Sequence, residues 1–219
     1  MPSECFLNLP EEKRRRILTA AQDELTRVTY DELSINRIVK EAGIPRGSFY
    51  TYFQGKDDLV EYMMGDYCRM LEHMLDRMFQ AGNADVFDAA RQAVVSTLAF
   101  CGQDGQETLY RNLFSCMRIN PRFSFERMLY NDRTFVELCL PYASRSGLQD
   151  ASDGGVAVLL DLLIGLVRNT VARIFAEPER REKHLADFET KLAIIRGGAI
   201  WGAQGQAFYG EEEKCQNLA

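Results

Sequence analysis

Residues 34–56 read SINRIVKEAGIPRGSFYTYFQGK and predict two short helices joined by a tight turn. Apolar residues repeat at helical spacing over residues 35–42, so one face of the first helix should be buried. Gly43 follows directly, where the left-handed end of a helix favours glycine. Pro45 suits the start of a second helix, because its missing N–H would be unpaired there in any case. This layout is typical of a helix-turn-helix reader of DNA.

The second of these helices has one apolar side and one side rich in hydrogen-bonding groups. Ser34 should cap the first helix, with its hydroxyl accepting a hydrogen bond from a backbone N–H. Phe49 and Phe53 lie four residues apart and should anchor the second helix in the core. Arginine can read guanine, and Ser or Thr can reach bases or phosphates, so the remaining side chains are predicted to face DNA. They are Arg46, Gly47, Ser48, Tyr50, Thr51 and Tyr52, with Lys56 just beyond the helix.

The run AGIPRGSFYTYF at residues 42–53, followed by Lys56 and Leu59, resembles the signature of the tetracycline-repressor (TetR) family. The resemblance is specific because many spaced positions agree, although Pro45 stands where the family usually has Ser or Thr. It implies an all-α, dimeric repressor that leaves a palindromic DNA operator when a small molecule binds its C-terminal domain. Carried over by position, it implies the DNA-facing residues Ser34, Arg37, Arg46, Gly47, Ser48, Tyr50, Thr51, Tyr52 and Lys56.

Helical periodicity without strand alternation predicts an all-α chain of about nine helices. We expect a three-helix DNA-binding domain at residues 8–56, a helical ligand-binding and dimerisation domain at 57–210, and a polar tail at 211–219. The first helix should cover residues 8–27, and one long helix over 56–80 should link the two domains. Further helices are expected at 85–100, 106–119 and 124–142, with a loop at 144–155 before the last two.

The charge of the chain is unevenly distributed. The 219 residues carry a net charge of −6, which argues superficially against a DNA partner. However, residues 34–56 contain four basic side chains and only one acidic one, a local charge of +3. The locally basic segment is what a DNA reader needs. The apolar stretch at 156–167 is too short to span a bilayer, and no secretory signal precedes the first helix, so a cytoplasmic protein without a membrane partner is expected.

The six cysteines and two histidines are scattered and lack zinc-finger or catalytic spacing. We expect small buried thiols in a reducing compartment, with a redox-responsive regulator as an alternative. The sequence has no nucleophile elbow, phosphate loop or metal-ligand cluster, so no enzyme activity, metal or cofactor is predicted. A helical oligomerisation module that does not bind DNA is the other alternative.

The last two helices predict a homodimer. Residues 156–176 are apolar nearly all round and must be covered on both sides. The final helix, ending near residue 202, contains interior glycines, each of which costs about 1 kcal/mol of helix propensity. Small residues four apart allow close helix contact, so we predict a two-fold four-helix interface rather than a purely intramolecular core. The predicted interface residues are Leu159, Leu163, Leu166, Ile195, Gly198 and Gly202.

Methionine and aromatic residues in the middle helices can line a ligand cavity, although such residues are more often plain core. Asp161 needs a partner because it lies within an apolar helix, and Arg168 lies seven residues on, near the same face. This pair is either a satisfied contact across the dimer, the reading we favour, or a polar anchor in an apolar pocket. The candidate ligand residues are Met64, Tyr67, Phe100, Tyr110, Phe114, Met117, Phe125, Asp161 and Arg168.

Overall fold

A computed structural model describes residues 2–82, 85–102, 106–114, 140 and 148–200. Within these ranges every regular element is a helix, apart from one isolated bridge between Leu148 and Ile200. The predicted all-α class is therefore confirmed. The predicted helix at 124–142 and tail at 211–219, like Met117, Phe125 and Gly202, lie outside the described residues except for Leu140.

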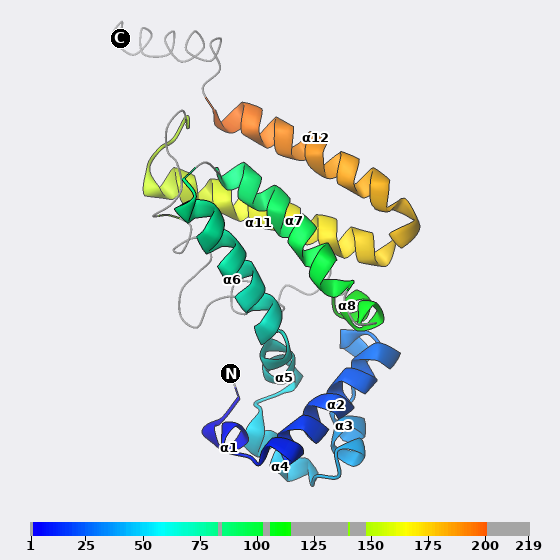
Figure 1. Cartoon of the computed structure of the whole chain (residues 1–219). Coiled ribbons are helices and arrows are strands. Elements are labelled where there is room, and N and C mark those ends of the chain that lie inside the picture. Colours follow the sequence, from blue (N-terminus) through cyan, green and yellow to red (C-terminus); the bar gives the residue numbers. More distant parts are fainter. Residues whose placement is uncertain (1, 83–84, 103–105, 115–139, 141–147, 201–219) are drawn as a thin grey trace, which may run out of the picture.

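Five elements form a compact unit at one end of the molecule (Figure 1). They are α1 (Glu4–Leu7), α2 (Glu11–Arg27), the 3-10 helix η1 (Tyr30–Glu32), α3 (Ile35–Glu41) and α4 (Arg46–Tyr52). Helix α2 begins at Glu11 rather than at residue 8, because Pro10 takes the N-cap position with an extended ψ of 139°. Helix α1 was not predicted, since its four residues are too few to show a helical period.

Helix α1 covers the end of α4. Phe6 is fully buried, and its ring centroid lies 4.6 Å from that of Phe53 and 6.0 Å from that of Tyr52. The Ser3 hydroxyl donates to the Thr51 carbonyl (2.7 Å), and the Ser3 backbone N–H donates to the Tyr52 carbonyl (2.9 Å). The last carbonyls of a helix lack partners within it, so the N-terminal segment caps α4.

The single long helix predicted over residues 56–80 is instead two helices, α5 (Lys56–Met63) and α6 (Gly65–Gln80). Met64 has φ −82° and ψ 0°, which opens the helical turn, and the poor helix former Gly65 follows it. Cys68 N–H still donates to the Met64 carbonyl (3.0 Å), so the two helices remain joined at a bend. Helix α6 ends at Gln80, and just beyond it Gly82 has a φ of 75°, a left-handed conformation that favours glycine.

The body of the protein is built from α6, α7 (Val86–Cys101), α8 (Glu107–Phe114), α11 (Asp153–Ala176), η3 (Pro178–Arg180) and α12 (Arg181–Ala199). Helix α11 packs against α7, α8 and α12, and α8 packs against α2 of the first unit. Asp85 caps α7 by accepting from Phe87 and Asp88 N–H (both 2.9 Å). Ser152 caps α11 by accepting from Gly155 N–H (3.0 Å), so the loop predicted at 144–155 is already helical from residue 153.

Among the described helices, α11 alone is long and apolar enough, by length and composition, to cross a membrane. It has 24 residues and begins at Asp153, three residues before the predicted start of the helix at 156. Helices of this kind also form the cores of soluble proteins, and α11 packs against three other helices of the body (Figure 1).

Candidate nucleic-acid interface

The turn between α3 and α4 is held by backbone geometry. Gly43 has φ +63°, which side chains with a Cβ rarely adopt. Beyond it, the Ile44 N–H donates to the Val39 carbonyl (3.0 Å), and the Ile44 side chain is buried beneath the turn. The left-handed glycine at position 43 was predicted from the sequence. The two features fix the angle at which α4 leaves α3.

Helix α4 is anchored on one side and open on the other. Phe49 and Phe53 are buried, with ring centroids 5.4 Å apart, as predicted. Tyr52 corrects the predicted set, because it is only 7% exposed and packs against Phe6. Lys13 Nζ covers the Tyr52 ring at 5.8 Å from its centroid. Tyr52 therefore supports the orientation of α4 rather than standing on its open face.

The open face of α4 is centred on Arg46. Its Nη1 donates to Asn36 Oδ1 of α3 (2.7 Å), and its Nη2 donates to the Tyr50 hydroxyl (3.4 Å). The guanidinium also lies 5.8 Å from the centroid of the Tyr50 ring, which is 48% exposed. These contacts hold an exposed arginine in one orientation. Asn36 was not in the predicted set, and the structure shows it exposed on α3.

The other residues predicted to face DNA differ in their exposure and in their hydrogen bonds. Gly47 is exposed, and no described atom lies within 4 Å of a Cβ built there, so another molecule can approach closely. Thr51 is exposed, but its hydroxyl donates to the Gly47 carbonyl of its own helix (3.2 Å). Ser48 is half-buried. Ser34 does stand at the N-cap of α3, but among the described residues its side chain makes no capping hydrogen bond, contrary to expectation.

Lys56 has a structural role that the sequence did not reveal. Its ammonium group donates to the carbonyls of Tyr30 (3.0 Å) and Asp31 (3.1 Å) and lies 4.6 Å from the centroid of the Tyr30 ring. The Tyr30 hydroxyl in turn donates to Asp57. Because an ammonium has three donors, these bonds leave one for a phosphate. Lys56 thus joins η1 to the start of α5.

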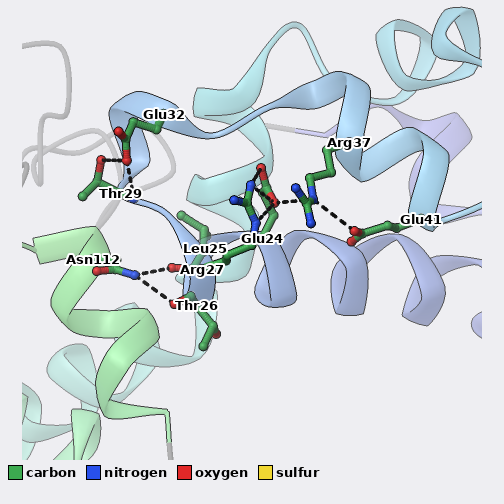
Figure 2. A network of polar contacts seen from close by, with 9 residues as sticks. All are labelled: Glu24, Leu25, Thr26, Arg27, Thr29, Glu32, Arg37, Glu41 and Asn112. Carbon is green, nitrogen blue, oxygen red and sulfur yellow. Dashed lines mark hydrogen bonds and ion pairs between the residues drawn. The ribbon is translucent and has the colours of Figure 1, made fainter.

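Arg37 belongs to a network around a buried carboxylate (Figure 2). Glu24 of α2 is 1% exposed, and its carboxylate accepts from Arg27 Nη2 (2.8 Å) and pairs with Arg37 Nε (3.2 Å). The same Arg37 nitrogen also reaches Glu41 (3.2 Å). A buried carboxylate requires such partners. Arg37, which was predicted to contact DNA, therefore uses its guanidinium to join α2 and α3.

Four of the predicted ligand residues come together in the body. The rings of Tyr67, Phe100, Tyr110 and Phe114 contact one another with centroids 5.5–6.1 Å apart. The Tyr67 hydroxyl is hydrogen-bonded to Thr97 Oγ1 (2.9 Å). Burial raises the pKa of Tyr67 well above its usual range and that of Tyr110 to about 12, so both phenols are neutral at physiological pH. We call these four residues, with Phe175, the aromatic cluster; Phe175 stacks on Phe114.

The remaining predicted ligand residues divide between two places. Met64 is buried beside the bend between α5 and α6. Asp161 and Arg168 are exposed on α11 and are not part of the aromatic cluster, so they do not form a polar anchor in an apolar pocket. The thiols of Cys68 and Cys101 are buried, and burial raises the pKa of each to about 12. Such thiols are poor nucleophiles, which weakens the redox alternative.

The predicted dimer face was wrong by about one residue on α11. Leu159 and Leu163 are buried inside the protomer, whereas their neighbours Val158 and Leu162 are 64% and 53% exposed. On α12, Ile194 is 69% exposed, and Ile195 is half-buried. Each step along a helix rotates a side chain by about 100°, so a shift of one residue changes the face. Leu166 is half-buried and Gly198 exposed.

The sequence and the fold match known regulators. Residues 17–63 match the family model described as bacterial regulatory proteins, tetR family. YvdT of Bacillus subtilis, an uncharacterized HTH-type transcriptional regulator, is 36% identical over 66 residues, which are 30% of this chain and 32% of that protein. BetI of Vibrio parahaemolyticus, an HTH-type transcriptional regulator, is 29% identical over 89 residues, 41% and 45% of the two chains. The matches span less than half the length of these relatives.

Two solved structures resemble almost the whole chain. NalD of Pseudomonas aeruginosa, the secondary repressor of the MexAB-OprM multidrug efflux pump, has a TM-score of 0.57 at 19% identity, covering 87% of this chain and 98% of that one. FadR of Bacillus subtilis, in complex with stearoyl-CoA, has a TM-score of 0.51 at 14% identity, covering 83% and 96%. At these identities the likeness concerns the fold alone.

Proposed function

Because this chain belongs to the TetR family of helix-turn-helix transcriptional regulators, we propose that it is a dimeric repressor that a small molecule releases from a palindromic operator. The observation that best supports DNA reading is the open face of α4. There Arg46 is exposed, yet its guanidinium is held in place by Asn36 and Tyr50. A guanidinium fixed in advance loses little freedom when it meets the paired acceptors of a guanine.

The proposed DNA-contacting residues differ in role. We assign base contacts to Arg46 and its partner Asn36, and phosphate contacts to Tyr50, Ser48, Thr51 and the free donor of Lys56. Gly47 allows the phosphate backbone to approach. Ser34 stays a proposed phosphate contact at the start of α3, while Arg37 and Tyr52 act by holding α3 and α4 in place.

A second copy of the chain is the proposed partner of the face formed by Val158, Leu162 and Ile194, which we call the open face of α11 and α12. Three large apolar side chains more than half exposed on two packed helices mark an association surface. Asp161 and Arg168 lie exposed on the same helix α11, where they can pair across a two-fold axis. A four-helix interface would hold the two copies of α4 one turn of DNA apart, roughly 34–36 Å.

The aromatic cluster is the proposed place of effector action. Some proteins of this fold bind small molecules, since the FadR structure contains stearoyl-CoA and a TetR from Acinetobacter baumannii contains minocycline. In this chain, the neutral Tyr67 and Thr97 hydroxyls offer a polar pair among aromatic rings. The dimer would have one conformation in which the two copies of α4 are spaced to fit DNA and another in which they are not. A ligand can release DNA only if it binds the second conformation more tightly than the first. We propose residues 8–56 as the DNA-binding domain, residues from 57 onward as the ligand-binding and dimerisation domain, and a cytoplasmic location.

The test is fluorescence anisotropy of the purified protein on the intergenic DNA beside its own gene, at several salt concentrations. We expect two subunits per palindromic site. Arg46→Ala should weaken binding by about 1–3 kcal/mol and relax the preference at one base pair. Arg69→Ala is the matched control, because Arg69 is an exposed arginine of the body that pairs with Asp66.

Two outcomes would contradict the proposal. Equal effects of Arg46→Ala and Arg69→Ala would mean that α4 does not read DNA. A protein that is dimeric but binds no fragment in a selection from the whole genome would be an oligomerisation module instead.

A further inference from the structure

One side chain of the body reaches into the DNA-binding unit. Asn112 of α8 donates from Nδ2 to the carbonyl of Leu25 (2.8 Å) and to the carbonyl of Thr26 (3.1 Å), as Figure 2 shows. Both acceptors lie in the last turn of α2, which ends at Arg27. Carbonyls there have no N–H partner within the helix. A single amide from a distant helix therefore caps α2.

The capped turn leads directly to the helix-turn-helix. Glu24, one residue before Leu25, is buried and bonds Arg27 and Arg37. Since Arg37 belongs to α3, any tilt of the α2 end is carried to α3 through this carboxylate. On the other side, Tyr110 and Phe114 flank Asn112 at two residues' distance and belong to the aromatic cluster. Asn112 thus lies between the proposed effector region and the DNA reader.

The chain itself connects the two parts through a bend rather than through one straight helix. The chain passes from α5 to α6 through the bend at Met64, where the helical turn opens. The packing of α8 on α2 is a second connection between the two parts. Hydrogen bonds are directional, so the two bonds of Asn112 define this angle more strictly than apolar contact does.

We propose that Asn112 is a positioning residue that sets the angle between the DNA-binding unit and the body, and thereby the spacing of operator half-sites that the dimer accepts. This inference rests on the proposed function. A ligand that displaces α8 at the aromatic cluster would break the two hydrogen bonds from Asn112 to α2. The DNA-binding unit could then change its angle relative to the body.

The first experiment needs no DNA. Asn112→Asp keeps the size of the side chain but replaces the donor by a carboxylate, which repels the two carbonyls. We expect amide hydrogen exchange in the last turn of α2 and in α3 to rise about tenfold, with little change in α12. Thr26→Ala is the control, because Asn112 contacts only the backbone carbonyl of Thr26, while the Thr26 hydroxyl donates to the Gln22 carbonyl within α2. Unchanged exchange in Asn112→Asp would overturn the inference, and Asn112→Ala replaces this variant if it does not fold.

The second experiment separates positioning from simple stabilisation. Synthetic palindromes carry the natural spacing between half-sites, or one base pair more or fewer. Wild-type protein should prefer the natural spacing by at least about tenfold, and Asn112→Asp should reduce this preference to about threefold or less. A merely structural role would weaken binding to all three duplexes by the same factor.

The two possible failures are distinguishable. If the wild type prefers one spacing and Asn112→Asp keeps that preference, the proposed function stands and the role of Asn112 is wrong. If the wild type binds no palindrome, the proposed function fails, and the spacing role fails with it.

Discussion

The helix-turn-helix and the α11–α12 pair are both two-helix units, but they are held in opposite ways. Helices α3 and α4 have 7 residues each, too few to be stable alone, whereas α11 and α12 have 24 and 19. Besides the buried Phe49 and Phe53, the short pair is fixed by polar contacts from elsewhere in the chain, from Ser3 to α4 and from Glu24 to α3. The long pair is held by apolar packing and keeps one apolar side uncovered.

The difference matches two tasks. A reader of DNA must present a few side chains at defined positions, and directional hydrogen bonds supply that definition. An association surface needs area and shape more than orientation, and long apolar helices supply these. The following predictions test whether the two units really depend on different forces.

The largest effect is expected from Phe49→Ala in α4. Phe49 is fully buried, so its loss should lower the free energy of unfolding by about 3–5 kcal/mol in urea denaturation. Tyr50→Ala, one residue away and half exposed, should change it by only about 0.5 kcal/mol while weakening DNA binding. Similar losses of stability in both variants would contradict the assigned orientation of α4.

Leu162 and Leu163 offer a matched pair in α11. Leu163→Ala should lower the free energy of unfolding by about 2–5 kcal/mol at any protein concentration, because Leu163 is buried within one subunit. Leu162→Ala should instead weaken self-association and leave the stability of the isolated subunit unchanged. Sedimentation equilibrium and urea denaturation at two concentrations separate the effects. A reversal between the two variants would restore the register first expected from sequence.

Glu24→Gln tests the polar network at the base of the reader. The neutral amide keeps the size of the side chain but loses its charge pairing with Arg27 and Arg37, at a cost of about 1–2 kcal/mol in thermal unfolding, because both arginines are partly exposed. Glu41→Gln is the control, since Glu41 is exposed and its ion-pair partner in the described part of the chain is Arg37. Its effect should stay below about 0.5 kcal/mol. Equal losses of stability in the two variants would mean that the burial of Glu24 does not strengthen its ion pairs.

The smallest effect concerns pH. Burial raises the pKa of Cys68 and Cys101 from 9.0 to about 12, so the folded state holds these protons more tightly than the unfolded state does. Their contribution to stability is complete below pH 9 and is lost as the pH rises from 9 to about 12. Between pH 6 and 8 we expect no pH dependence from them. Thiol labelling at pH 8 should reach exposed Cys5 quickly and these two only on unfolding; rapid labelling of Cys68 would contradict this.

The sequence predicted what depends on neighbours along the chain. Gly43 was placed correctly at the end of α3 because a positive φ almost demands glycine. Phe49 and Phe53 were assigned to the core because a spacing of four identifies one side of a helix. The helix-turn-helix and the outward-facing Arg46 could therefore be predicted from the sequence alone.

What depends on distant contacts could not be predicted. Tyr52 is buried and Tyr50 exposed because Phe6 covers one of them, and α1 was too short to be recognised. The partners of Lys56 are backbone carbonyls, which no sequence pattern identifies. Helix α11 is apolar nearly all round, so the pattern of its sequence does not show which side faces the core. Leu162, which is exposed, therefore could not be distinguished from Leu163, which is buried.

The three glycines Gly165, Gly197 and Gly198 lie on α11 and α12, and no described atom lies within 4 Å of a Cβ built at any of them. A methyl group at these positions would cost a single subunit little, and it would even favour helix formation. If a second copy lies against them, the same methyl group would keep it at a distance. A bacterium that holds many related regulators needs each to ignore the others. In the proposed dimer, these three absent side chains would set which related chains can form mixed pairs with this one, and therefore how independently its target genes are controlled.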